Sequence, residues 1–319
     1  MNFNKRQMWF NKKNSENAVT WMQECLVSNL QIDKRTKIAS MGSCFAREIK
    51  NWLIKNQFNY LVTENEKMPW ESSKIFKGDK GIASYEHAST AWERVYNTFT
   101  IKHIMDYTFN DNMLDKRLID VKIKGVSYIS DILRSRIIYK DMDTACDDIL
   151  NHIECSKNVL CNADLLIITL GLTEIWESKK RKLVAASNPF KYYKLPDDFE
   201  FRTTKYQENL DNLNYIYKLL KQYNKNLKIL ITVSPVHLLA TFRDDVDVIT
   251  ASCESKSILR AVAGEFANNK DVYYFPSYEI ATIVSILDEI NVYPDNHHVS
   301  KELINVIMNT FNKRIIKQI

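Results

Sequence analysis

The chain has 319 residues, of which 45% are hydrophobic and 26% charged, as in a globular protein with a sizeable core. Its formal net charge of +5 is mild for this length, and its lysine clusters lack interleaved aromatic residues, so the composition argues against nucleic-acid binding. No segment reaches the ~18 apolar residues that a membrane span needs, and the N-terminus has no apolar run of signal-peptide length. We therefore expect a cytoplasmic protein without a membrane span.

Glycine is scarce, and the cysteines are irregularly spaced. The chain has six glycines among 319 residues, a share far below the average of ~7%. Neither G-x-G-x-x-G nor the P-loop pattern occurs, so the usual dinucleotide and phosphate cradles are excluded and we expect no bound cofactor. The six cysteines include no C-x-x-C, which predicts reduced thiols rather than a disulfide framework or a zinc ribbon.

Four short apolar runs predict buried strands of a parallel sheet. They are near-continuous rather than alternating, because the strands of such a sheet are covered on both faces. In chain order these runs are residues 37–41, 164–170, 227–233 and 272–275, and residues 59–62 form a weaker fifth.

Helical periodicity fills the intervals between the strands. Apolar residues share one helical face within residues 46–54, 210–220, 258–266 and 303–311. Strands that alternate with helices predict right-handed βαβ units, and therefore a three-layer α/β fold with a doubly wound, mostly parallel sheet.

We expect one domain over residues 1–319, with an N-terminal extension (residues 1–35) and two insertions. The first, about residues 63–140, is rich in aromatic and charged residues, and we expect helices near residues 88–107 and 129–137. The second, about residues 178–205, contains turn signals. Because ligands of an open α/β sheet bind at its carboxyl edge, we place both insertions there.

Ser43 follows Gly42, directly after the first predicted strand and at the start of the first predicted helix. The hydroxyl would stand at the carboxyl end of the sheet, and the free N–H groups of the helix's first turn would face a developing oxyanion. Serine is also a common helix N-cap, so position alone leaves both roles open. Cys44 is a rival nucleophile, although the residue after such a turn usually points into the packing.

A serine nucleophile needs a base, and Asp295-x-x-His298 offers one in a predicted loop before the last helix. One turn can bring both side chains to the sheet edge, so that Asp295 accepts the Nδ1–H of His298 and leaves Nε2 facing Ser43. The alternative is a surface turn with incidental histidines. A metal site at His297 and His298 is less favoured, because adjacent imidazoles rarely bind one ion and no third ligand cluster accompanies them.

The stretch Gly42-Ser43-Cys44-Phe45-Ala46 resembles the pentapeptide that names the GSCFA family, an SGNH-like group of bacterial proteins. Further segments are similar to the same family, in order along most of the chain: residues 168–176, 232–236, 255–259, 272–280 and Asp295-x-x-His298-x-Ser300. The resemblance implies an SGNH/flavodoxin-like fold, and it implies Ser43, Asp295 and His298 as the catalytic residues.

The sequence departs from the broader SGNH pattern at one point. SGNH enzymes have an Asn, after a Gly that follows a central strand, whose amide helps to bind the oxyanion. Here Gly171 is followed by Leu172 and then Thr173, whose hydroxyl is a shorter donor. Either Thr173 substitutes, or Asn97 fills the role unless it is only a helix-end residue.

Two further side chains are candidate substrate contacts. Glu174 could orient a substrate hydroxyl or only cap the following turn. His237 follows the third predicted strand, at its carboxyl end, and could contact substrate or be packed or solvated.

The resemblance and the triad predict an acyl-ester hydrolase of the O-acetylesterase type, acting on a glycan or a similar hydroxylated molecule. An O-acetyltransferase acting on a cell-surface polysaccharide precursor, with acetyl-CoA as acyl donor, would use the same residues. The third hypothesis is a catalytically silent module that binds saccharides, for which exposed aromatic residues within the first insertion would serve as stacking platforms. These aromatic residues are Trp70, Tyr85, Trp92 and Tyr96.

Overall fold

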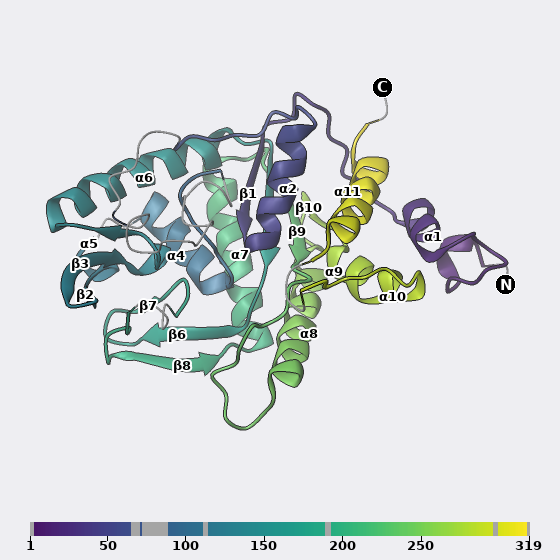
Figure 1. Ribbon diagram of the computed structural model, residues 1–319. Helices are drawn as coiled ribbons and strands as arrows, with labels where there is room; N and C mark the ends of the chain where they lie inside the picture. The colour runs from purple at the N-terminus through teal and green to yellow at the C-terminus, as the bar shows by residue number, and fades with distance from the viewer. Residues whose placement is uncertain are drawn as a thin grey trace.

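The computed structural model describes residues 3–64, 71, 89–110, 114–188, 193–295 and 299–317. A parallel sheet lies at its centre, with strands in the order β1-β5-β9-β10 (Figure 1). These strands are β1 (Ile38–Gly42), β5 (Leu165–Leu170), β9 (Lys228–Val233) and β10 (Val272–Tyr274). Each coincides with a predicted run to within one residue at either end, which confirms the predicted parallel sheet.

The weaker fifth run is reduced to a single bridge beside β1. Tyr60 pairs in parallel with Ile38, and its hydroxyl lies 2.6 Å from Ser40 Oγ. With this bridge counted as the second strand, the spatial order becomes 2-1-3-4-5, which is the flavodoxin-like order. Successive strands are first added on one side of β1 and then, from β5 onward, on its other side. Ligands of such folds bind at the carboxyl ends of the strands beside this switch point, which lies between β1 and β5.

Helices cover both faces of the sheet and complete the three-layer fold (Figure 1). One face packs on α2 (Cys44–Lys55) and α11 (Lys301–Ile315), with the short elements α9 (Ser277–Glu279), η4 (Ile280–Val284) and α10 (Ser285–Leu287) at its margin. The other face packs on α4 (Thr98–Phe109), α6 (Met142–Asn162), α7 (Tyr206–Tyr223) and α8 (Val248–Phe266).

Alternate residues of the same strand enter different cores. Ala39 and Met41 of β1 lie in the core beneath α4 and α7, whereas Ile38 lies in the core beneath α2 and α11. β5 is buried at all six positions. This double coverage is why the strands are near-continuous apolar runs in the sequence.

The first insertion contains a small antiparallel sheet and differs from the prediction. α5 (Leu114–Arg117) leads into β2 (Leu118–Ile123), β3 (Val126–Asp131) and β4 (Ile138–Tyr139). The prediction of a helix near residues 129–137 is wrong, because β3 occupies the start of this segment and only a 3₁₀ turn, η3 (Ile132–Arg134), follows.

Strand pairing and buried ion pairs explain the difference. β3 pairs with β2 along six residues, and the buried Asp131 is paired with Arg117 and Arg134. The helix expected near residues 88–107 begins only at Thr98, because the Asn97 side chain accepts the Thr100 N–H and caps it there.

The second insertion begins earlier than expected. β6 (Glu174–Ser178) pairs with β7 (Leu183–Val184) and β8 (Phe199–Thr203) in a three-stranded antiparallel sheet. At the N-terminus, η1 (Lys5–Gln7) precedes α1 (Ala18–Cys25), which packs on α11, and Ile32 bridges to Ile316. Of the helices within the described ranges, none combines the length and the apolar character that crossing a bilayer requires.

Candidate active site

The turn between β1 and α2 places Ser43 at the carboxyl edge of the sheet. Gly42 has φ +147°, and a Cβ at this position would lie 2.6 Å from the Thr169 carbonyl oxygen, so only glycine fits. Ser43 is the N-cap of α2, and its Oγ accepts the Phe45 N–H at 3.3 Å. The predicted strand–Gly–Ser–helix arrangement is therefore present, and the capping role that serves as its alternative is present as well.

The Ser43 hydroxyl also contacts a second serine across the sheet edge. Its Oγ donates to Ser234 Oγ at 3.1 Å, and Ser43 is only 2% exposed. Ser234 directly follows β9 and donates its N–H to the carbonyl of Leu170, the last residue of β5. The ends of β1, β5 and β9 therefore meet at Ser43, at the place where ligands of this fold class bind.

Residues on either side of the other two triad candidates are held at the same edge. Tyr293 donates its hydroxyl to the Pro235 carbonyl at 2.6 Å, next to Ser234. The Ser300 N–H closes the loop on the Val292 carbonyl at 2.9 Å. Asp295 lies exposed within this loop, whereas His297 and His298 lie outside the described residues. The described ends of the loop are thus held close to the end of β9.

Cys44, the rival nucleophile, is half-buried at the first position of α2. It lies close enough to Arg94, Tyr96 and Lys256 to affect the pKa of each. Burial by itself would lower the pKa of Arg94, but the groups around it that can carry negative charge, Tyr96, Glu93 and Cys44, raise it above its usual value. Burial also raises the pKa of Tyr96. The start of α2 thus faces an arginine that stays charged and a tyrosine that stays neutral.

The segment after β5 is held by backbone contacts. The N–H groups of Gly171 and Leu172 both donate to the Tyr96 carbonyl at 2.9 Å, and a Cβ on Gly171 would lie 3.0 Å from that oxygen. The Thr173 N–H donates to Ser255 Oγ at 2.9 Å. The backbone donors of Gly171 and Thr173 are therefore already engaged, which leaves the Thr173 hydroxyl as the group to consider for an oxyanion.

Asn97 and Glu174 line a small cavity of about 100 Å³ together with Tyr96 and Leu172. The Asn97 Oδ1 accepts from Thr100, so the amide nitrogen is turned away from that helix end. Glu174 accepts from the Thr241 hydroxyl at 2.5 Å and from the Phe242 N–H at 3.4 Å. Asn97 thus caps a helix and also borders a cavity, and Glu174 stabilises the turn after β9.

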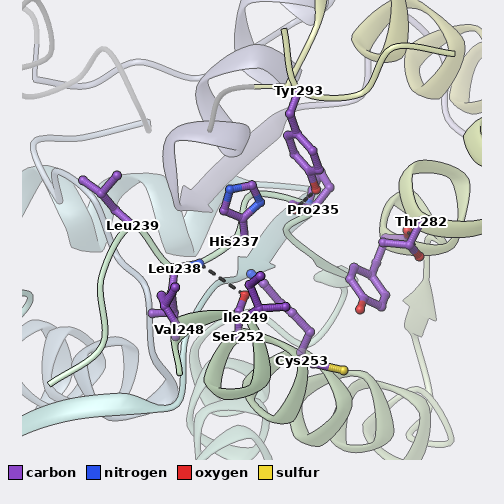
Figure 2. Close-up of a pocket in the computed structure, with 12 residues that line it drawn as sticks. Pro235, His237, Leu238, Leu239, Val248, Ile249, Ser252, Cys253, Thr282 and Tyr293 are labelled. Carbon is purple, nitrogen blue, oxygen red and sulfur yellow. Dashed lines mark hydrogen bonds between the residues drawn. The ribbon is translucent and has the colours of Figure 1, made fainter. Parts of the chain in front are cut away.

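A larger cavity of about 550 Å³ opens beside the end of β9, and His237 is one of its walls (Figure 2). The His237 ring meets the Tyr293 ring edge to face, with centroids 4.6 Å apart. Figure 2 shows Leu239 at one side of the cavity, with Tyr293 and Pro235 above it and Cys253 below. His237 therefore lies four residues after the end of β9 and beside a cavity, and its contact with a substrate stays a prediction.

Lys256 is a residue of this site that the sequence analysis did not assign. It comes from α8, lines the larger cavity, is 3% exposed, and donates Nζ to the Gly171 carbonyl at 2.7 Å. Burial lowers the pKa of Lys256 to about 7, and the nearby Cys44 partly opposes this shift. A lysine on the apolar face of a helix, between Ser255 and Leu259, was the signal that could have found it.

The fold and this edge define a flavodoxin-like α/β protein with a serine at the first strand–helix turn. A family model described as the GSCFA family matches residues 37–311, from β1 into α11, and the chain therefore belongs to the GSCFA family. This confirms the resemblance of the pentapeptide at residues 42–46. A comparison with curated proteins found no match.

Within the described ranges, no cluster of three or more His, Cys, Asp and Glu side chains is arranged to hold a metal ion. Trp92, expected among the exposed saccharide-stacking residues, is instead fully buried and donates its indole N–H to Ser156 Oγ at 2.9 Å. Trp70 and Tyr85 lie outside the described residues.

Proposed function

We propose that this protein is a serine-dependent acyl-ester hydrolase that acts on a glycan or a similar hydroxylated molecule. The observation that carries the proposal is the position of the Ser43 hydroxyl, at the N-terminus of α2 and the meeting point of three parallel strands. The α2 N-terminus carries a partial positive charge, which stabilises an oxyanion formed on the ester carbonyl that Ser43 attacks.

In the proposed reaction, Ser43 Oγ attacks the ester carbonyl and gives its proton to His298, which Asp295 orients. The carbonyl oxygen becomes an oxyanion that accepts hydrogen bonds from the first turn of α2 and from Asn97 or the Thr173 hydroxyl. The alcohol leaves with the proton from His298, and water then cleaves the acyl-serine by the same steps in reverse order.

Charges around the turn support this chemistry. Arg94 stays protonated close to Cys44, and Lys256 reaches the same edge through the Gly171 carbonyl. A charged arginine near the turn lowers the cost of forming an oxyanion there, and Lys256 adds to this effect at a pH below its pKa of about 7.

The test is covalent labelling with a fluorophosphonate probe, followed by peptide mapping. We expect labelling of the wild-type protein at Ser43 and none of Ser43→Ala. Ser234→Ala is the matched control, because it removes the hydrogen-bond partner of Ser43 but keeps the nucleophile, and it should still be labelled. A probe attached to Cys44 would reassign the nucleophile, and an unlabelled wild-type protein would favour the silent saccharide-binding module.

Hydrolysis and acyl transfer use the same residues and differ in the group that resolves the acyl-serine. An O-acetyltransferase is the alternative within this proposal. Labelled acetyl-CoA, supplied with a hydroxylated acceptor, distinguishes the two, because only a transferase moves the label to the acceptor instead of to water.

A further inference from the structure

The larger cavity combines apolar walls with one buried cation at its inner end. We propose that it binds the acyl part of the substrate, an apolar chain longer than acetyl, and that Lys256 holds the carboxyl group of the released acid. This inference rests on the proposed ester hydrolysis and names its acyl class as a medium-chain carboxylate.

Apolar side chains form the mouth of the cavity. Leu239 and Ile249 are 66% and 79% exposed, and Val248 and Leu238 continue the apolar wall inward. Exposed apolar side chains grouped around a concavity lose contact with water when an apolar ligand enters. The cavity volume of about 550 Å³ lies within the ~300–1,000 Å³ range of small-molecule sites and far exceeds what an acetyl group needs.

Lys256 supplies the polar end of the cavity. Its ammonium group has three donors, and its hydrogen bond to the neutral Gly171 carbonyl uses one of them. Over the described residues, Lys256 forms no ion pair with a carboxylate. A buried cation without a counter-ion is costly, and an anionic ligand group within the cavity would compensate that cost.

Neighbouring residues connect the wall of the cavity to Ser43. Pro235 lines the cavity and directly follows Ser234, which accepts the Ser43 hydroxyl. Gly171, the partner of Lys256, directly follows Leu170, whose carbonyl accepts the Ser234 N–H. An acyl chain lying between Leu239 and Ile249 would therefore present its carboxyl carbon toward Ser43 and a carboxyl oxygen toward Lys256.

The experiment is calorimetric titration of the wild-type protein with acetate, butanoate, hexanoate and octanoate at pH 6.5, where the pKa of about 7 keeps most of Lys256 charged. Each methylene buried should tighten binding by up to about fourfold. Lys256→Met should weaken octanoate binding at least tenfold, whereas Lys218→Met, an exposed lysine on α7, should leave it unchanged. Ile249→Ser, at an exposed position, should reduce the gain per methylene without affecting folding.

Two results would overturn the inference: an affinity that does not increase with chain length, or equal octanoate binding by the wild-type protein and Lys256→Met. Protection of Ser43 links the cavity to catalysis. Bound octanoate should slow fluorophosphonate labelling, and octanoate that binds without slowing it would show that the cavity is not the acyl site. Labelling with no chain-length preference would leave the proposed function intact, whereas octanoate binding without any labelling would overturn that function and leave only a carboxylate site.

Discussion

The buried ammonium group of Lys256 should make the free energy of unfolding depend on pH in a defined direction. Its pKa is lowered from 10.5 to about 7 in the folded protein, so above pH 7 the folded chain is mostly neutral at this site while the unfolded chain stays protonated. Stability therefore rises with pH between 7 and 10.5, because the unfolded chain binds the extra proton. The slope approaches ~1.4 kcal/mol per pH unit, which gives about 2 kcal/mol between pH 7.5 and 9.

Lys256→Met isolates this effect. The stability of the wild-type protein minus that of the variant should rise by about 2 kcal/mol between pH 7.5 and 9. Urea unfolding followed by circular dichroism, with thiols kept reduced, measures both proteins at each pH. The other titratable groups near Lys256 remain in both proteins, so their contributions largely cancel. These groups are Cys44, His237, Cys253, Tyr278 and Tyr293.

A constant offset is also expected, since the Gly171 carbonyl loses its donor in the variant. Only the change of the stability difference with pH tests the lowered pKa of Lys256; the constant offset does not. Lys218→Met should give a pH-independent difference. A flat or falling difference for Lys256→Met would refute the reasoning, because it would mean that Lys256 stays charged in the folded protein.

Three further predictions concern the turn, the core and the loop. Gly42→Ala should destabilise the protein by ~3 kcal/mol or more, since its Cβ would meet the Thr169 carbonyl oxygen at 2.6 Å; a melting temperature within a degree of the wild type would contradict this. Burial lowers the pKa of His103 to about 4, so stability should fall by up to ~3 kcal/mol as the pH drops from 6.5 to 4. His103→Gln should flatten that acid limb in chemical unfolding, and an unchanged limb would count against it. Tyr293→Phe removes the hydroxyl that anchors the loop before α11, and should slow probe labelling of Ser43 more than tenfold while costing only ~1 kcal/mol; unaltered labelling would show that the anchor does not position the base.

The central sheet could be predicted because its strands carry their environment in their composition. β5 is buried at every position, so a strand in its place must be largely apolar, and Thr169 is the one polar residue within it. The need for glycine at position 42 could be predicted as well. In a chain with few glycines, a glycine directly after a strand indicates a backbone conformation or a close contact that a side chain would prevent. These signals are local, and a single sequence contains them.

The insertions and the lysine depend on contacts that a single sequence does not reveal. Asp131 lies at the end of a strand because Arg117 and Arg134 neutralise it within the core. Arg134 is a near neighbour in sequence, but the pairing with Arg117, 14 residues away, has no local pattern. The sequence showed Lys256 only as a charged residue on an apolar helix face. Because a lysine at such a position can also reach solvent, its burial could not be predicted. Its significance comes from the Gly171 carbonyl 85 residues away and from a cavity built by separate segments.

The two roles of Ser43 are compatible rather than competing. An N-cap places its oxygen at the positive end of a helix, beside unsatisfied N–H groups, and an attacking serine needs the same surroundings. The cap bond to the Phe45 N–H is long, at 3.3 Å, so little stability is lost when the oxygen moves onto a carbonyl carbon. Ser43→Ala should therefore cost ~1 kcal/mol and Ser43→Gly only a few tenths, since glycine is the better cap, yet both should abolish labelling. Unfolding midpoints and probe labelling, measured on the same samples, separate the two roles. If Ser43 were only a helix cap, the alanine variant would still be less stable than the glycine variant, but the probe would not label even the wild-type protein.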